Sequence, residues 1–171
     1  MNHKKIQFGC GKNYLNGYIN CDISNNVKTD RIVDLNNFPY PFADNSAEEI
    51  IMDNVLEHLD DVVMVMKEVN RILINGGVAR IYVPYAKSDG AVEDPQHKHF
   101  FTETSMNYYI DGHDYNFYSD FRFKMLKNQP YIASKTFPRT LRKYIPFKNI
   151  LKYYIWNIYD GIYFELEAVK K

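Results

Sequence analysis

The chain opens with a strand-like stretch that runs into a glycine turn, and a carboxylate follows eleven residues after the second glycine. Residues 4–8 read KKIQF, Gly9 and Gly11 flank Cys10, and a second short stretch, YINCD, ends at Asp22. Glycine allows a sharp turn and a close approach of backbone to ligand beyond the carboxyl end of a strand. A carboxylate at the end of the next strand can accept hydrogen bonds from both hydroxyls of a ribose. The pattern predicts an α/β chain with a nucleoside site at this turn.

The spacing disfavours a dinucleotide cofactor. A dinucleotide fingerprint has a third glycine, a helix that binds the pyrophosphate, and an acid about 20 residues further on. Here Asn13 and Tyr14 stand where the third glycine is sought, and the segment before Asp22 is too short for a crossover helix. A nicotinamide-dependent oxidoreductase is therefore a poor fit, whereas a nucleoside without phosphate groups is compatible. The remaining alternative is a purely structural turn followed by a surface aspartate.

Strand-like and helix-like stretches alternate along the rest of the chain, which is typical of an α/β domain. Apolar residues recur at helical spacing in the stretch LEHLDDVVMVMKEVNRIL, and Gly76 with Gly77 is expected to end that helix. A second helix is expected over 102–110. The expected strands cover 4–8, 18–23, 31–34, 48–53, 78–84, 120–126 and 163–169. We expect a Rossmann-like, mostly parallel sheet with an antiparallel edge strand and helices on both faces.

Composition narrows the classes of function. A length of 171 residues suits one domain spanning 1–171, and a formal net charge of zero gives no general attraction to nucleic acid. The two cysteines, Cys10 and Cys21, do not form a disulfide framework, so a cytoplasmic location is expected. No apolar run approaches the length of a transmembrane segment.

Five motifs occur in a familiar order: FGCG, INCD, DLNNFPYPFADNSAEEI, DNVLEHLDD and LINGGVARIYVP. With these motifs, the chain resembles the class I S-adenosylmethionine (SAM)-dependent methyltransferases, and in particular small members whose first motif is a GCG-K run. The resemblance covers about residues 4–110. It implies a seven-stranded sheet with an antiparallel last strand, SAM as cofactor and S-adenosylhomocysteine as product.

The resemblance also implies the cofactor-binding residues. The glycine turn would follow the methionine moiety and ribose, and Asp22 would hold the ribose hydroxyls. Asp34 would lie beside the adenine, and Asn54 would border the sulfonium. The full set is Gly9, Cys10, Gly11, Asp22, Asp34, Leu35, Asn54 and Val55.

Three histidines are the candidates for catalysis. His58 follows the fourth expected strand, and His97 and His99 lie in the long loop after the fifth. An imidazole titrates near neutral pH and can take a proton from an acceptor hydroxyl. The alternatives are an exposed helix-entry pair at Glu57 and His58, and solvated histidines in the loop. We expect no metal, because the sequence offers no further cysteine or carboxylate at zinc-site spacing beside the HxH pair.

The basic and aromatic segment 131–163 has several interpretations. It would form an acceptor-binding cap, a contact to anionic glycan or lipid, or a nucleic-acid surface. We favour a pair of helices with a buried aromatic face and a solvated basic one. The Pro-Pro-aromatic tetrapeptide of DNA amino-methyltransferases is replaced by DNVL at 53–56, so nucleic acid is not an expected substrate.

The expected function is in-line methyl transfer from SAM to a small-molecule or sugar-type acceptor, including a glycolipid. Residues 1–84 would form the cofactor-binding half, and 85–171 would supply the acceptor-side loop, helices and last two strands. The alternative is a catalytically inactive, methyltransferase-like SAM-binding or interaction module. Two departures from the family favour it, namely Gln7 in place of an acid and Asn13 in place of the usual third glycine. A homodimer is compatible with the sequence.

Overall fold

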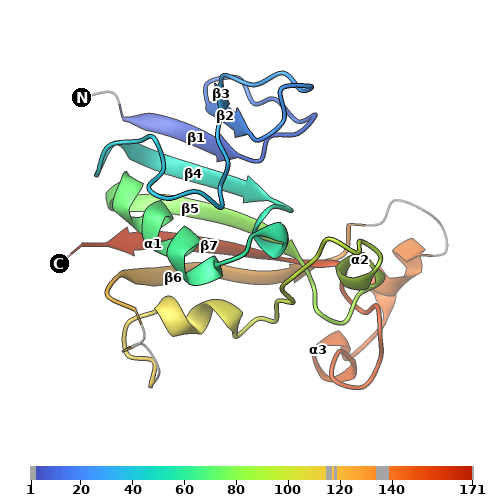
Figure 1. Ribbon diagram of the computed structural model, residues 1–171. Helices are drawn as coiled ribbons and strands as arrows, with labels where there is room; N and C mark the ends of the chain where they lie inside the picture. The colour runs from blue at the N-terminus through green and yellow to red at the C-terminus, as the bar shows by residue number, and fades with distance from the viewer. Residues whose placement is uncertain (1–2, 115–116, 118, 134–138, 171) are drawn as a thin grey trace.

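A single mixed sheet organises the protein, which is described by a computed structural model at residues 3–114, 117, 119–133 and 139–170 (Figure 1). The sheet has seven strands in the order β3-β2-β1-β4-β5-β7-β6. The strands are β1 (Lys4–Phe8), β2 (Ile19–Asp22), β3 (Arg31–Ile32), β4 (Ala47–Asp53), β5 (Leu73–Pro84), β6 (Arg122–Tyr131) and β7 (Gly161–Val169). The Rossmann-like, mostly parallel sheet expected from the sequence is confirmed.

The antiparallel strand is the last in the chain but not the last in the sheet. Strands β1 to β5 pair in parallel, and β7 is antiparallel to both β5 and β6. Gly161, which begins β7, pairs with Pro84 at the end of β5 and with Tyr131 at the end of β6. The chain therefore returns between two strands that end at the same edge, and β6 becomes the edge. This corrects the expected edge position of the antiparallel strand.

The register brings the ends of the first strands together. Phe8 of β1 pairs with Cys21 of β2 and with Met52 of β4. The residues that follow these positions therefore emerge at one edge of the sheet. In a parallel α/β sheet this edge is where ligands bind.

Helix α1 (Val62–Ile72) covers one face of the sheet. Asp61 caps it by accepting a hydrogen bond from the backbone N–H of Met64 at 3.0 Å. Its buried residues Val65, Met66 and Val69 belong to the same core as the inward side chains of the strands. The helix is shorter than expected. Its predicted first turn is a separate 3-10 helix, η1 (Leu56–His58), and the two glycines already lie within β5.

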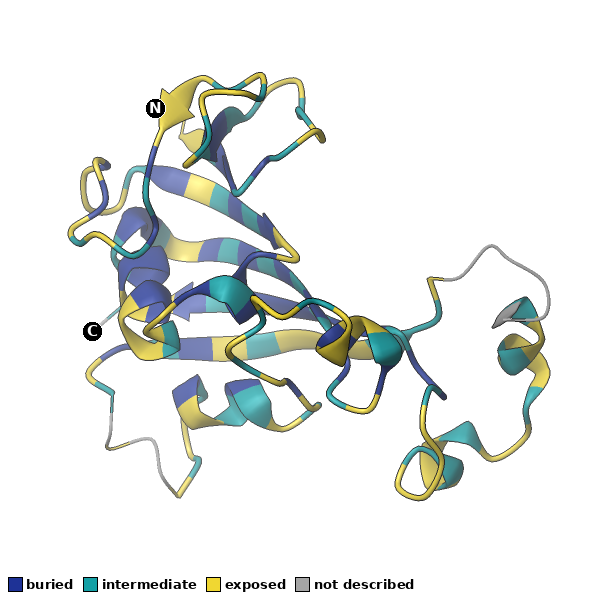
Figure 2. Ribbon diagram, turned by 45° about the vertical axis from the view of Figure 1, so that its right-hand side comes forward, coloured by how far each residue is buried: buried dark blue, intermediate teal, exposed yellow. Residues whose placement is uncertain are grey.

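Among the described residues, no helix covers the opposite face of the sheet, and strand residues there alternate between buried and more exposed classes (Figure 2). Polar side chains lie on that face. Arg80 bonds to Glu49 at 3.1 Å and to Glu165 at 3.0 Å, and its guanidinium also donates to the hydroxyl of Tyr163 at 2.8 Å. The expectation of helices on both faces is therefore wrong for the described part of the chain. The linkers 9–18 and 23–30 are shorter than the dozen or so residues that a crossover helix requires.

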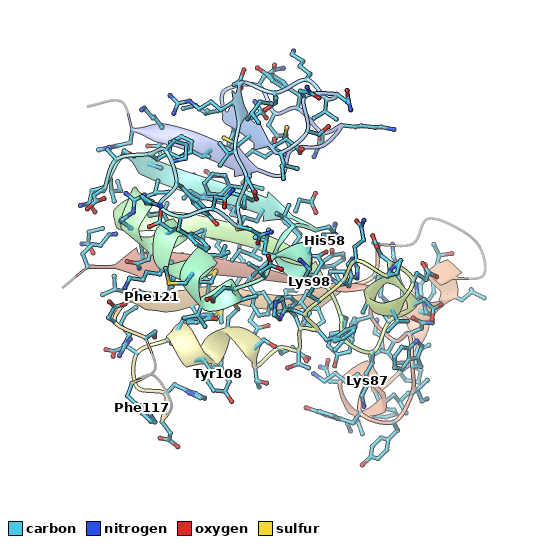
Figure 3. The ribbon with its side chains drawn as sticks, viewed as in Figure 1. His58, Lys87, Lys98, Tyr108, Phe117 and Phe121 are labelled. Carbon is cyan, nitrogen blue, oxygen red and sulfur yellow. The ribbon has the colours of Figure 1, made fainter. Side chains whose placement is uncertain are left out.

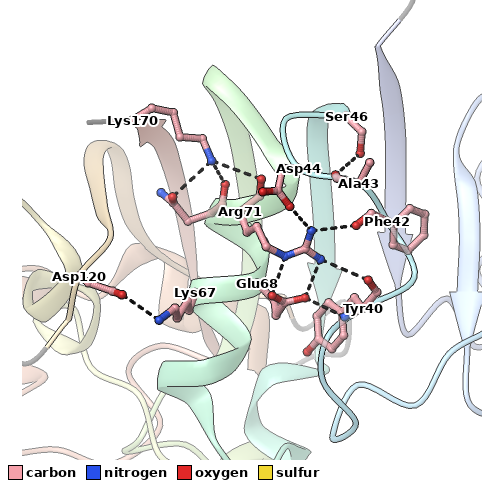
Figure 4. Close-up of polar contacts among 11 residues, drawn as sticks. Tyr40, Phe42, Ala43, Asp44, Ser46, Lys67, Glu68, Arg71, Asp120 and Lys170 are labelled. Carbon is pink, nitrogen blue, oxygen red and sulfur yellow. Dashed lines mark hydrogen bonds and ion pairs between the residues drawn. The ribbon is translucent and has the colours of Figure 1, made fainter.

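The loop between β3 and β4 is fixed to α1 by an ion pair between the buried Glu68 and the partly buried Arg71 (Figure 4). Both carboxylate oxygens of Glu68 accept from Arg71 at 2.7 Å, and one also accepts from the backbone N–H of Tyr40 at 2.7 Å. Arg71 further donates to Asp44 at 2.6 Å, and the hydroxyl of Tyr40 donates to the carbonyl of Leu35 at 2.8 Å. These bonds hold the start of the loop beside the ends of β1 and β4.

The remaining helices are short: α2 (Asp89–Val92), η2 (Ser105–Tyr109), η4 (Arg139–Tyr144) and α3 (Lys148–Leu151). The helix expected over 102–110 is thus a 3-10 helix. In the segment 131–163, of which 134–138 lies outside the described residues, Tyr144 and Tyr154 are each 83% exposed. The favoured interpretation of a buried aromatic face is therefore wrong there, because such short turns cannot bury a continuous face. None of the helices in the described residues has the length and apolar character needed to cross a bilayer.

Candidate functional site

A cavity of about 310 Å³ opens at the carboxyl ends of β1, β2 and β4. Its volume lies in the range of small-molecule sites. Six of the eight expected cofactor residues line it: Gly9, Asp22, Asp34, Leu35, Asn54 and Val55. The structure adds Ile23, Val33, Asn36, His58 and Leu59 to the lining. Most of the added residues are sequence neighbours of the expected ones, so they could have been found from the sequence by their proximity to the motifs.

The turn after β1 requires glycine at its first position. Gly9 has a φ of +64°, and a Cβ built there would lie 2.3 Å from Cγ2 of Val55. Ordinary carbon contacts are about 3.5–4.0 Å, so no side chain fits. Gly9 and Val55 line the cavity side by side, and the backbone of Gly9 has no side chain of its own to cover it there.

The carboxylate of Asp22 is oriented by its own backbone surroundings. One oxygen accepts from the N–H of Gly11 at 2.8 Å, and the other accepts from the N–H of Ser24 at 2.9 Å. Each oxygen keeps a further lone pair, so the carboxylate can also accept from ligand hydroxyls. Gly11 therefore positions Asp22 instead of lining the cavity. Cys10 is buried behind the turn, with its thiol 3.6 Å from the carbonyl of Lys28.

Asp34 begins a turn at the other side of the cavity. Its carboxylate accepts from the N–H of Asn36 at 2.9 Å and from the side-chain amide of Asn37 at 2.7 Å. The side chain of Asn36 in turn accepts from the N–H of Asp60 at 2.9 Å. The turn is thereby linked to the loop before α1, and the carboxylate still has lone pairs for an amino group.

Asn54 redirects the chain at the end of β4. Its φ of +52° lies in the left-handed region, which residues other than glycine seldom adopt. Its backbone N–H donates to the carbonyl of Tyr82 at 2.9 Å, and its side chain donates to Asp53 at 2.9 Å. After this turn, both Val55 and His58 reach the cavity.

Beside the cavity, Glu57 lies between two histidines. Glu57 is fully buried, and within the described residues neither carboxylate oxygen has a hydrogen-bond partner. Burial raises the pKa of Glu57 to about 7. Nε2 of His97 is 3.9 Å from a carboxylate oxygen, and the rings of His58 and His97 are 4.6 Å apart between centroids. The sequence placed Glu57 beside His58 after the fourth strand, with an exposed helix-entry pair as the alternative, and did not predict that Glu57 is buried.

The loop that carries His97 is attached to η1. The backbone N–H groups of Lys98 and His99 both donate to the carbonyl of Glu57, at 2.8 and 3.2 Å. Figure 3 shows His58 and Lys98 close together at this edge of the sheet. His99 lines a different cavity, with Val62 and Tyr109, and not the one lined by Gly9. The structure thus brings together two of the three candidate histidines.

Comparisons with known proteins agree with this architecture. A family model described as a methyltransferase domain matches residues 7–81. A SAM-dependent methyltransferase from Archaeoglobus fulgidus matches at a TM-score of 0.63 and 15% identity, over 97% of this chain and 86% of that chain. One from Mesorhizobium loti matches at a TM-score of 0.59 and 11% identity, over 96% and 90%.

The YcgJ protein from Bacillus subtilis matches at a TM-score of 0.61 and 12% identity, over 99% of this chain and 92% of that chain. No curated protein matches the sequence significantly. At such identities, the likeness to solved structures shows the fold alone.

Proposed function

We propose that the chain is a class I SAM-dependent methyltransferase and that it methylates a small-molecule or sugar-type acceptor, since residues 7–81 match a methyltransferase-domain model and the sheet has the fold of solved methyltransferases. The observation that best supports this function is the cavity. The turn of Gly9 exposes its backbone there, and the oriented carboxylate of Asp22 lies at the same edge.

The residues present fit SAM. Asp22 has free acceptor capacity for the ribose hydroxyls, and Asp34 has it for the exocyclic amino group of adenine. The apolar side chains of Ile23, Val33 and Leu35 line the cavity near both carboxylates and suit the faces of the base. Asn54 would border the sulfonium at the end of β4.

Bound SAM would supply a methyl group that its sulfonium already activates. The protein then has to align an acceptor with that carbon and to receive the acceptor's proton. His58 is suited to this task, because it lines the cavity and also contacts His97 beside Glu57. In this proposal the acceptor lies between η1 and the loop 85–101, and 85–171 forms the acceptor side. His99 would act elsewhere, in the second cavity.

The proposal also places the protein in the cytoplasm. Cys10 and Cys21 are both buried free thiols, which suits a reducing compartment.

The alternative function is a SAM-binding module without turnover. Gln7, which stands where the family has an acid, is buried, and its amide oxygen has no partner within the described residues. It does not line the cavity, so the cofactor contact of the family's acid would be missing.

Product formation separates the two functions. The protein is incubated with SAM and, separately, with sugars, glycolipid headgroups and small hydroxyl compounds, and S-adenosylhomocysteine is quantified by mass spectrometry. We expect acceptor-dependent product with at least one class, and a loss of about a hundredfold in His58→Ala with SAM binding retained. Tight SAM binding without product from any class would favour the inactive module.

A further inference from the structure

Glu57, His58 and His97 form a compact group of metal-ligand type. Each residue offers one ligand atom, and these atoms all lie within 4.8 Å of one another. The residues come from η1 and from the loop after α2, so the group is assembled only by the fold. His58 also lines the cofactor cavity, which places the group beside the expected site of reaction.

Within the described residues the carboxylate of Glu57 has no hydrogen-bond partner, and it faces His97, whose Nε2 lies 3.9 Å from one of its oxygens. Glu57 is fully buried. Burying an unpaired carboxylate is costly, so the group must either hold a proton or meet a cation. The nearby carboxylates of Asp53 and Asp94 add negative charge at this position. The surroundings therefore favour a cation over a second anion.

His97 is already oriented as a ligand. Its Nδ1 lies 3.0 Å from the carbonyl of Ala91, and because a carbonyl only accepts, Nδ1 carries the hydrogen. Nε2 consequently presents its lone pair toward Glu57, 3.9 Å from the carboxylate oxygen. A second hydrogen bond that fixes the tautomer is the usual support of a metal-bound histidine. Ligand atoms around a tetrahedral ion with bonds of about 2.1 Å lie roughly 3.4 Å apart, so the three ligand atoms, which lie within 4.8 Å of one another, would have to move closer together when an ion binds.

We propose that Glu57, His58 and His97 bind one divalent transition-metal ion, with an open coordination position toward the cofactor cavity. Two imidazoles and one carboxylate with an open position form a donor set of catalytic zinc sites. Mg²⁺ and Ca²⁺ prefer oxygen ligands throughout, so they fit this group poorly. The expectation of no metal came from sequence spacing alone, which does not reveal that Glu57 and His97 meet.

The role of the ion rests on the proposed function. An acceptor hydroxyl would bind at the open position, where the ion lowers the pKa of that hydroxyl. With the ion bound, His58 acts as a ligand and no longer as the base, so the proton of the hydroxyl passes to water. The resulting oxygen would attack the methyl carbon of SAM. One oxygen–carbon bond forms, the sulfur–carbon bond breaks, and its electron pair stays on sulfur as S-adenosylhomocysteine leaves. No oxidant or reductant is needed.

Metal binding can be tested without any acceptor. The protein is stripped with a chelator and titrated calorimetrically with Zn²⁺ and, separately, with Mg²⁺; Co²⁺ loading is followed by visible absorption. We expect one Zn²⁺ per chain, no comparable Mg²⁺ binding, and the absorption bands of a four-coordinate Co²⁺ site. Glu57→Gln and His97→Ala should each weaken Zn²⁺ binding by about 10–100-fold or more.

His99→Ala is the matched control, because His99 lies two residues away but lines another cavity. It should bind Zn²⁺ as the unaltered protein does. The absence of a one-to-one site, or equal affinity in Glu57→Gln, His97→Ala and the unaltered protein, would overturn the proposal. Thermal melting of the metal-free variants separates a lost ligand from a lost fold. SAM titration of metal-free protein is the independent check, since its failure would count against the proposed function and not against the metal site.

Discussion

Replacing Gly9 with alanine should destabilise the protein for two separable reasons. Gly9 has a φ of +64°, and a left-handed conformation costs a residue with a Cβ about 1–2 kcal/mol. The new Cβ would also lie 2.3 Å from Cγ2 of Val55, and such overpacking costs about 1–3 kcal/mol. We therefore expect the free energy of unfolding to fall by about 2–5 kcal/mol in Gly9→Ala.

Gly11 offers a matched control, because its φ is +49° but no heavy atom lies within 4 Å of a Cβ built there. Gly11→Ala should cost only the backbone part, about 1–2 kcal/mol. Combining Gly9→Ala with Val55→Ala should recover the steric part and give a non-additive double-mutant cycle. Urea denaturation followed by circular dichroism measures five proteins: the unaltered protein, Gly9→Ala, Gly11→Ala, Val55→Ala and the Gly9→Ala/Val55→Ala double variant. Equal losses in Gly9→Ala and Gly11→Ala, or strict additivity in the cycle, would refute the reasoning.

Three further results are expected. An inosine-type analogue of SAM should bind worse than SAM in calorimetry, because the carboxylate of Asp34 can accept from an amino group but not from a carbonyl; equal binding would make Asp34 purely structural. Arg71→Met should lower the free energy of unfolding by about 3 kcal/mol, since it leaves the buried carboxylate of Glu68 unpaired, and unchanged stability in urea would argue against that ion pair. Burial alone would raise the pKa of Glu68, but hydrogen bonds from Arg71 and from Tyr40 lower it. The contribution of Glu68 to the free energy of unfolding is therefore complete above the pKa of this group in the unfolded chain, about 4.3. It is lost as the pH falls through the lower pKa of Glu68 in the folded protein. Unfolding curves across that range should show a weaker pH dependence in Glu68→Gln, and identical slopes would contradict this assignment.

The grouping of residues around the cavity was predictable because these residues are set by local sequence. A glycine turn and the ends of parallel strands meet at one edge in any sheet of this type, so Gly9, Asp22 and Asn54 could be placed together. Cys10 and Gly11 could not be separated from Gly9 by sequence, because adjacent residues of a tight turn point in different directions. The apolar residue Ile23 could also have been predicted to line the cavity, because it directly follows Asp22.

The group beside the cavity depends on contacts between distant parts of the chain. Glu57 and His97 are brought together by the loop after α2, and no local pattern encodes that contact. The HxH spacing suggested one shared location for His97 and His99. Instead the backbone turns where Lys98 and His99 both donate to the carbonyl of Glu57, so the two rings diverge.

The sequence analysis predicted more helices over the faces of the sheet than the described residues form. The alternation of strand-like and helix-like stretches indicated a sheet with helices on both faces, whereas the linker lengths around β2 leave no room for crossover helices. The linker 9–18 was recognised as too short, yet its consequence for the whole face was not. The ion pairs of Arg80 with Glu49 and Glu165 show how a polar face takes the place of helices.

Calorimetric titration with SAM, with NAD in parallel, tests the central claim most directly. We predict one-to-one SAM binding with a dissociation constant of roughly micromolar, about 8 kcal/mol, and no measurable binding of NAD. Asp22→Ala should weaken SAM binding by about 2 kcal/mol, because it removes the acceptor for two ribose hydroxyls. A folded protein that fails to bind SAM, or an Asp22→Ala variant that binds it equally well, would contradict the account.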